Sequence, residues 1–162
     1  GAAIRGDWGK IIIEDGCNVE QNCTIHMFPG VTVHLHKGAH IGHGAIIHGA
    51  TFGRHCIIGM NAVIMDEVVL GDECIVGALS FIKQGEVYAK RSLIVGNPAK
   101  MIKKVSAEMM QWKKQGTAIY QQLPQQCKDS LIACEPIKNT TNTPQSDSGI
   151  VYKPWKNTQT KK

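Results

Sequence analysis

The sequence predicts a mainly β protein: a parallel β-helix, followed by a C-terminal α-helix and a disordered tail. Three observations lead to this fold class. An aliphatic residue returns every six positions, a glycine often follows it, and the chain is rich in glycine (17 of 162 residues) but only 6% aromatic. A period of six fits neither an α-helix nor an alternating strand. It fits short strands joined by tight turns, with three hexapeptides closing each coil.

The repeat occupies most of the first half of the chain. Its anchors are Ile13, Val19, Ile25, Ile41, Ile47, Phe52, Ile58, Ile64, Leu70, Val76 and Ile82. We expect the anchor side chains to point into the coil and the small residues four places later to fill its corners. Four of the six cysteines, Cys17, Cys23, Cys56 and Cys74, occupy this small-residue position, where Cys behaves as a small hydrophobe.

The cysteine spacing also bears on metal and redox chemistry. The chain contains no C-x-x-C pair, so zinc–cysteine and thioredoxin-like sites are not indicated. We therefore expect reduced, structural thiols, which are typical of a cytoplasmic protein.

The repeat has one long interruption. Ile25 and Ile41 are 16 positions apart, where two hexapeptides would need about 12. We interpret the excess as a loop that protrudes from the coil around Phe28–Gly38.

Three segments follow from the pattern: a β-helix over residues 1–95, a turn and helix over 96–135, and a disordered tail over 136–162. The repeat is already running at Gly1, so we expect an N-terminally truncated β-helix. Gly96–Lys100 reads as a turn, and Ser106 as the cap of a helix. We expect Pro124 to end or kink that helix and a second helical piece to span Gln125–Cys134. The expected apolar face, packed on the coil or on a neighbouring subunit, comprises Met109, Trp112, Ile119 or Tyr120, and Leu123.

The charge distribution argues against nucleic acid as a partner. Formal net charge is +5, but residues 1–95 carry 7 Lys/Arg against 9 Asp/Glu, and residues 96–162 carry 11 against 4. The basic excess is spread along the C-terminal region and forms no compact basic block. No run approaches the 18 or so apolar residues of a membrane span, so we also expect no membrane partner.

Two histidines are predicted to stack on the outside of the coil. His26 and His48 each follow an anchor directly, and their anchors lie one coil apart on the same face, so we place the two side chains on neighbouring strands. The same outward column contains Arg5, Met65 and Lys83. His43 comes two positions after Ile41, near a corner, and would point away from the pair.

Three imidazoles arranged in this way suit a metal site shared between two subunits. The spacing alone leaves open that the histidines are plain surface residues of a solenoid.

These residues resemble the γ-class carbonic anhydrase superfamily. The resemblance rests on Arg5-Gly6-Asp7, the run from Asn18 to Asn22, Ile25-His26 and His43-x4-His48. Gly38–Asp66 and Trp112–Tyr120 are similar to its PaaY/CaiE-type subgroup, which is associated with acyl-CoA thioesters. The likeness covers roughly residues 1–135 and implies a left-handed coil and a homotrimer with sites between subunits.

The resemblance also implies residue roles. His26 and His48 of one subunit and His43 of its neighbour would hold a divalent metal, Zn first, with Fe or Co as alternatives. Arg5 and Asp7 match an inter-subunit ion pair at the structural interface. No cofactor-binding residue other than these metal ligands is indicated.

Four further residues are candidates for the catalytic set. Asn18 matches a polar residue that lines the site. Glu20 stands where the family usually has Gln, and it could act as a base or repel bicarbonate. His34 and His36 lie where active anhydrases carry acidic proton shuttles, and a histidine titrates in the right range for that task.

The resemblance implies an enzyme in which a metal hydroxide attacks CO2 to give bicarbonate, a carbonate dehydratase-like lyase. A PaaY-type acyl-CoA thioesterase is the first alternative, with acid and free CoA as products. A hexapeptide acyltransferase that uses a histidine as general base, or a non-catalytic accessory protein, are further alternatives. In each enzymatic case the partner is a small molecule.

Overall fold

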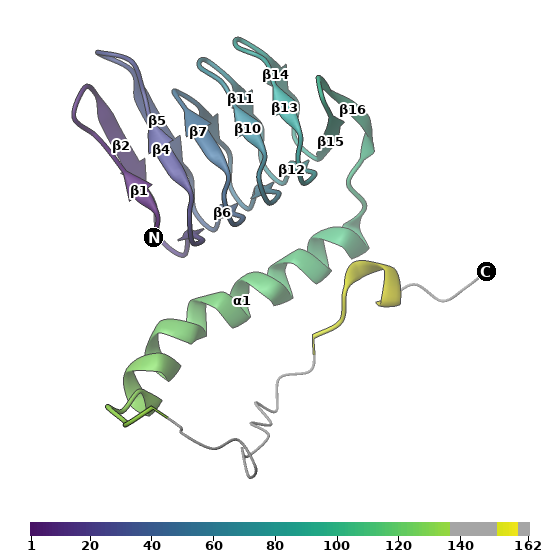
Figure 1. Cartoon of the computed structure of the whole chain (residues 1–162). Helices are drawn as coiled ribbons and strands as arrows, with labels where there is room; N and C mark the ends of the chain where they lie inside the picture. Colours follow the sequence, from purple (N-terminus) through teal and green to yellow (C-terminus); the bar gives the residue numbers. More distant parts are fainter. Residues whose placement is uncertain (137–151, 159–162) are drawn as a thin grey trace. The chain divides into compact units, whose positions relative to one another are not determined.

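The computed structural model describes residues 1–136 and 152–158, and the chain divides into two compact units, Gly1–Gln121 and Gln122–Lys162. The first unit contains a parallel β-helix whose strands stack in three sheets, as Figure 1 shows. Sheet A contains β1 (Ala3–Ile4), β4 (Thr24–His26), β7 (Ile46–His48), β10 (Val63–Ile64) and β13 (Phe81–Ile82). Sheet B contains β2 (Lys10–Ile13), β5 (Thr32–Leu35), β8 (Thr51–Phe52), β11 (Val69–Leu70) and β14 (Val87–Tyr88). Sheet C contains β3 (Asn18–Val19), β6 (His40–Ile41), β9 (Ile57–Ile58), β12 (Ile75–Val76), β15 (Ser92–Gly96) and β16 (Ala99–Lys104).

The anchors of the repeat form the core, as the sequence predicts. From Ile25 to Ile82 the anchor side chains are all but fully buried and stack on their counterparts one coil away. The first coil is more exposed: the anchor Ile13 is 41% accessible, and Ile4, the register partner of the anchor Ile25, is 48% accessible.

The turns between strands explain the six-residue spacing. Apart from the turn at Gly30, with a φ of 79°, each turn from Gly16 to Arg91 places one residue at a φ of about +54° to +76°, and these residues recur every five or six positions except across the interruption. Glycine or asparagine occupies several of them, because L side chains rarely adopt this left-handed conformation. The positions are Gly16, Asn22, Gly38, Gly44, Gly49, His55, Asn61, Glu67, Glu73, Leu79, Gly85 and Arg91.

The corner cysteines pack as small hydrophobic residues. Cys23, Cys56 and Cys74 are buried and Cys17 is half-buried, and all six cysteines of the chain are free thiols. Each corner thiol donates to a main-chain carbonyl of the next coil, for example Cys23 Sγ to Gly42 O at 3.1 Å. The four corner thiols therefore pack as the repeat predicts, whereas Cys127 and Cys134 are exposed; that the thiols are reduced stays a prediction.

The expectation of a protruding loop over Phe28–Gly38 was wrong for most of its length. Residues Thr32–Leu35 form β5, which pairs in parallel with β2 and β8. Val33 and Leu35 are buried, so Leu35 is the missing anchor of sheet B. The extra residues fall in the corner before β5, because a corner can lengthen without disturbing the register of the sheet.

The coil ends in an antiparallel pair. β16 runs back along β15 at the edge of sheet C, and the turn around Gly96–Ala99 joins them. Helix α1 (Ala107–Ser130) follows, and Ser106 caps it by accepting a hydrogen bond at its Oγ from the Met109 amide at 3.2 Å. Residues 131–136 are not helical, so the expected second helical piece is absent there. Pro124 lies inside one continuous helix, on a stretch exposed enough for water to replace the lost backbone hydrogen bond.

The helix packs on the coil as predicted, but its contact face coincides only in part with the predicted one: Met109 packs partly on the coil and the Tyr120 ring lies 5.0 Å from that of His40. Its buried residues are Met110, Lys113, Gly116 and Thr117, whereas Leu123 and Tyr120 are exposed. Lys113 is 2% exposed and its Nζ donates to the Gly38 carbonyl at 2.6 Å. Burial lowers the pKa of Lys113 to about 8. Small residues such as Gly116 and Thr117 allow the helix to pack closely on the coil. Lys113 is buried beside them because backbone carbonyls of the coil turns face the helix and need a donor.

The tail is described only in part. Of the predicted disordered segment 136–162, the structure describes Pro136 and residues 152–158, which include a 3-10 helix, η1 (Trp155–Thr158); the rest lies outside the described residues. Among the helices of the described ranges, none combines the length and apolar character that crossing a membrane requires.

Candidate functional site

The predicted histidine pair forms on sheet A. His26 on β4 and His48 on β7 are direct register partners, and their ring centroids lie 5.4 Å apart. Both side chains point outward, since the anchors before them, Ile25 and Ile47, point inward and strand residues alternate. The backbone amide of Arg5 bonds to Ile25, which places Arg5 in the same column as predicted.

Each histidine of the pair donates a ring N–H to a carboxylate. His26 Nε2 lies 3.0 Å from Asp7 Oδ1, and His48 Nδ1 lies 2.7 Å from Asp66 Oδ1. Since a carboxylate only accepts, these bonds select tautomers in which the second nitrogen of each ring carries a lone pair. The arrangement matches the carboxylate–histidine pairs that orient metal-ligating imidazoles.

Arg5 and Asp7 form an ion pair within one chain. Arg5 Nη2 lies 2.6 Å from Asp7 Oδ2, and this guanidinium lowers the pKa of the Asp7 carboxyl. The contact fixes the carboxylate that holds His26. The inter-subunit role implied by the family resemblance stays a prediction.

Two exposed aromatic side chains flank the pair. The Trp8 ring lies 5.3 Å from that of His26, and the Phe28 ring contacts His48 edge-on at 4.8 Å. Together they give the outward face of the pair an apolar border.

The third predicted ligand lies elsewhere on the chain, as expected. His43 is in the turn between β6 and β7, half-exposed, with Nδ1 3.6 Å from Glu20 Oε2. Glu20 is buried and accepts a hydrogen bond at 2.6 Å from Asn18 Nδ2. Asn18 Oδ1 is buried without a partner among the described residues, so this polar pair leaves one acceptor unused.

The donor set fits a divalent metal only if a second chain contributes. Within the described residues, His43 does not join His26 and His48 in one cluster of potential ligands. Two oriented imidazoles and one exposed imidazole per chain are the right chemistry for Zn²⁺, and His43 is exposed enough to reach a neighbouring molecule.

The structure does not bring His34 and His36 to the histidine pair. His34 lies on β5 of sheet B and His36 directly follows that strand, whereas His26 and His48 are on sheet A. They contact Glu14, with His34 Nε2 and His36 Nδ1 at 2.8 and 2.7 Å from its Oε1. Hydrogen bonds lower the pKa of the Glu14 carboxyl. The bond from the Lys37 amide has the largest effect, and the bond from the His34 ring has the next largest.

Sequence reasoning missed the carboxylates that organise these histidines. Asp66 follows His48 by 18 positions, one more than the 17 that separate the register partners Ile47 and Ile64, and it lies in the turn after β10, so the period alone does not select it. Glu14 precedes His36 by 22 positions, and the lengthened corner hides that relation.

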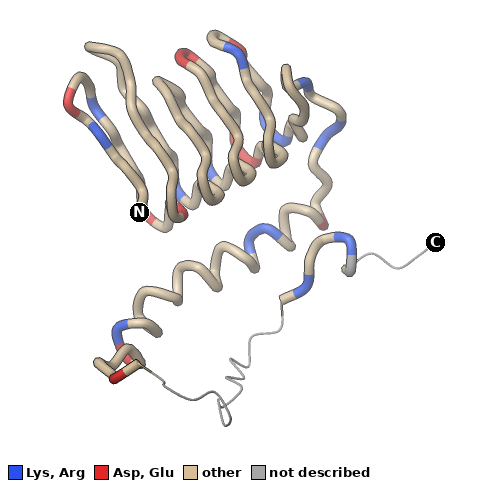
Figure 2. The backbone as a smooth tube through the Cα atoms, in the orientation of Figure 1, with Lys and Arg blue, Asp and Glu red and all other residues tan. Residues whose placement is uncertain are grey.

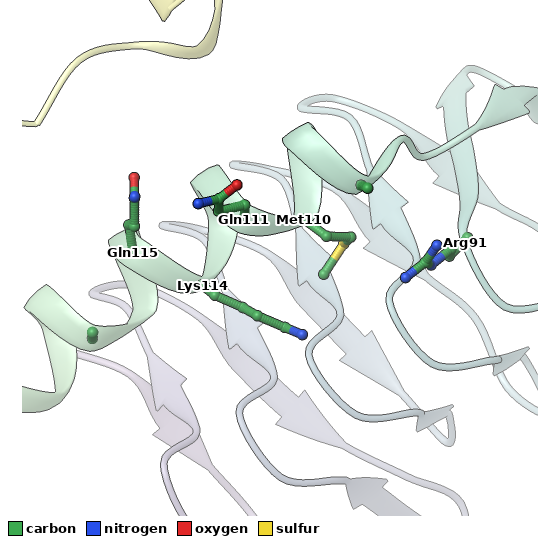
Figure 3. Close-up of a pocket in the computed structure, with 7 residues that line it drawn as sticks. Arg91, Met110, Gln111, Lys114 and Gln115 are labelled. Atoms are coloured by element: carbon green, nitrogen blue, oxygen red, sulfur yellow. The ribbon is translucent and has the colours of Figure 1, made fainter.

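A pocket elsewhere on the first unit contains none of the predicted site residues. It lies between the helix and the coil and is lined by Arg91, Met110, Lys114 and neighbouring helix residues (Figure 3). Arg91 and Lys114 are both paired with Glu73, which reduces their attraction for an anion. Figure 2 shows the Lys and Arg residues in short, separate segments along the coil and the helix, some of them adjacent pairs such as Lys103 and Lys104.

The fold and the repeat define a class of protein that known sequences and structures confirm. The family pattern described as "Bacterial transferase hexapeptide (six repeats)" matches residues 49–84. A hexapeptide transferase family protein from Anaplasma phagocytophilum is 26% identical, with a TM-score of 0.73 over 77% of this chain and 74% of that one. A Bacillus cereus protein described as a candidate acetyltransferase is 31% identical, with a TM-score of 0.77 over 79% of this chain and 74% of the other.

Within this class the sequence is similar to the carnitine operon protein CaiE. Identity is 40% to CaiE of Proteus sp. (strain LE138), over 84% of this chain and 69% of the relative. It is 41% to CaiE of Escherichia coli (strain K12 / DH10B), over 85% of this chain and 70% of the relative. The chain belongs to the CaiE family of hexapeptide-repeat proteins.

Proposed function

We propose that this protein is a metal-dependent enzyme of the γ-carbonic anhydrase type, with CO2 and bicarbonate as its substrate pair. His26 and His48 of one subunit and His43 of a second would hold one divalent metal, for which Zn²⁺ fits best and Fe or Co are alternatives. The observation that carries the proposal is the register pair His26–His48, each ring held by its own carboxylate. A metal bound there supplies Lewis-acid activation of water and of a carbonyl group.

The residues around the pair have separate tasks. Asp7 and Asp66 hold the imidazole tautomers, and Arg5 holds Asp7 in place. Asn18 fixes one oxygen of Glu20, and the other oxygen faces His43 at 3.6 Å. Glu20 can therefore accept a proton at Oε2 on the side of the chain where a neighbouring subunit would complete the site.

A second copy of the chain is part of the proposal, because one chain does not assemble the three ligands. The outward row of sheet A, beside the histidines, carries the apolar residues Ile46, Val63 and Phe81. Ile46 is 43% exposed and the other two are half-buried. Such a row suits a homotrimer interface that continues into the metal site.

Two other reactions have support in particular observations. The resemblance to the PaaY/CaiE-type subgroup, which is associated with acyl-CoA thioesters, favours thioester hydrolysis at the same site, and the similar proteins are carnitine operon proteins CaiE. The Bacillus cereus relative described as a candidate acetyltransferase favours acyl transfer to an amine or hydroxyl. A histidine base suffices for the latter, without oriented metal ligands.

The test begins with metal content. Protein purified without chelators is expected to contain about one metal per protomer at this site, as a three-histidine centre requires. His43→Ala should lose that metal together with CO2 hydration. His55→Asn is a matched control, because His55 lies in a turn at φ 57 that asparagine tolerates.

A mixing experiment tests whether the site is shared. Subunits carrying His26→Ala and subunits carrying His43→Ala should each be inactive, and co-refolding them should restore part of the metal content and activity. Release of free CoA from acetyl-CoA, measured with and without an amine acceptor, separates hydrolysis from transfer. If His43→Ala keeps both its metal and full activity, the three-histidine site is wrong.

A further inference from the structure

The chain contains a second cluster of metal-ligating side chains, on a different sheet from the histidine pair. Glu14, His34 and His36 each offer one ligand atom, and these atoms all lie within 4.8 Å of one another. The two rings face each other with centroids 3.8 Å apart. Neither the family resemblance nor the proposed function uses Glu14.

The β-helix itself builds this cluster. β2 and β5 are neighbours in sheet B with Ile12 opposite His34, and the Glu14 amide bonds to the Leu35 carbonyl at 3.0 Å. Because strand residues alternate, His34 and His36 point outward on either side of buried Leu35. The Lys37 amide donates to Glu14 Oε2 at 2.9 Å, which leaves Oε1 facing both rings.

We infer that Glu14, His34 and His36 form a second divalent transition-metal site, with Zn²⁺ as its ion. Two imidazole nitrogens and one carboxylate oxygen are a ligand set that Zn²⁺ uses in proteins, with water in the remaining position. A tetrahedral ion with bonds of about 2.1 Å separates its ligand atoms by about 3.4 Å. The present separations of 2.7 and 2.8 Å from Glu14 Oε1 would have to open only slightly.

The place of the cluster indicates what the ion does. Glu14 belongs to the first coil, whose anchors are the least buried of the repeat, with Ile13 41% exposed. His34 and His36 belong to the second coil. An ion bound by both coils would link the first coil to the second, where hydrophobic burial is weakest. Because such an ion binds only the folded chain, it stabilises the fold by mass action.

This inference is independent of the proposed metal centre, so titrations with Zn²⁺ can separate the two. Zn²⁺ is added to chelator-treated full-length protein in a calorimeter. Wild type should bind two ions per protomer, His43→Ala one, and the double variant His34→Gln, His36→Gln one. Glutamine keeps an amide donor for Glu14 but removes the imidazole ligand, so the variant retains the hydrogen bonds and loses the ion.

The outcomes distinguish the two sites. If His43→Ala binds no Zn²⁺ while wild type binds one, the second site is wrong and the proposed centre stands. If wild type and His43→Ala each bind one ion and the glutamine variant binds none, the second site stands and the proposed centre is wrong.

Whether the ion stabilises the first coil is tested separately, by melting temperature and amide hydrogen exchange in the His43→Ala background. Saturating Zn²⁺ should raise the melting temperature and slow amide exchange in β2, with no change in β11. The glutamine variant in the same background should show neither effect while melting like its parent without Zn²⁺. Equal slowing in the glutamine variant would overturn the assignment of the ion to these residues.

Discussion

Single residues set the spacing of the coils. Gly59 follows the anchor Ile58, and a Cβ on it would lie 2.4 Å from the backbone nitrogen of Ala78 in the next coil. The glycine is needed for space, because the backbone of the neighbouring coil cannot move aside. The recurrent aliphatic–glycine pair in the sequence therefore records how closely successive coils approach.

We expect Gly59→Ala to destabilise the protein by about 1–3 kcal/mol, as overpacking a close-packed interior does. Gly85→Ala is the comparison, since nothing lies within 4 Å of its Cβ position and only its φ of +76° opposes alanine. That strain costs about 1–2 kcal/mol. Urea denaturation measures the loss in both variants, and a loss below about 1 kcal/mol for Gly59→Ala would contradict the steric argument.

The histidine pair shows how far residue-level prediction reaches. The six-residue count is enough to place His26 opposite His48, because the register of a β-helix follows from the repeat. Their carboxylate partners were missed, since Asp66 reaches His48 from a turn of the following coil. Side-chain contacts across coils depend on corner lengths, which the hydrophobic pattern does not record.

Among the elements, the helix departs most from its predicted packing. The apolar pattern selects Met109 and Leu123. Met109 does pack partly on the coil, but Lys113 and Gly116 are the more deeply buried, because the coil offers turn carbonyls to the helix. The corner before β5 is a similar case. The 16 positions between Ile25 and Ile41 indicate an insertion but not where it lies. The strand β5 falls within this interval and was not recognised from the count.

The buried Lys113 predicts a pH dependence of stability. Burial lowers its folded pKa to about 8, whereas the unfolded value is the model-peptide value of about 10.4. Between these values the unfolded chain binds more protons, so this lysine makes the free energy of unfolding rise with pH across that window. Below about pH 8 both states are protonated and the penalty for burying the charge is fully present.

Lys113→Met tests this dependence. The free energy of unfolding of wild type minus that of the variant should increase from pH 8 to pH 10, measured by urea denaturation at each pH. The difference isolates Lys113 from the other groups that titrate there. A difference that stays flat or falls with pH would mean that the ammonium group is not buried as described. Lys114→Met, which changes a mostly exposed neighbour, is the control.

At the scale of the whole molecule, the fold class follows almost entirely from the sequence. Anchors, corners and turns recur in one period, so every local preference favours the same parallel β-helix. The oligomeric assembly does not follow from the sequence in the same way. An outward apolar row shows that a surface is available, but it does not identify the partner that covers it.

We expect Ile46→Glu to abolish the proposed trimer. Ile46 lies on the outward row of sheet A, and a carboxylate there would be buried without a counter-charge at the interface. Val69→Glu is a matched control: Val69 is 41% exposed, against 43% for Ile46, but lies on sheet B. Light scattering after gel filtration should give a monomer for Ile46→Glu and a trimer for Val69→Glu and wild type. A trimeric Ile46→Glu protein would place the interface elsewhere.

The antiparallel strand β16 has a consequence for solubility during expression and storage. An unpaired sheet edge can recruit a strand from another chain and start fibrous aggregation. β16 covers the end of sheet C, and Lys100, Lys103 and Lys104 along it are exposed. Charged lysines on an edge strand repel a second copy of the chain. The strand that completes the β-helix therefore also prevents one β-helix from adding end-on to another.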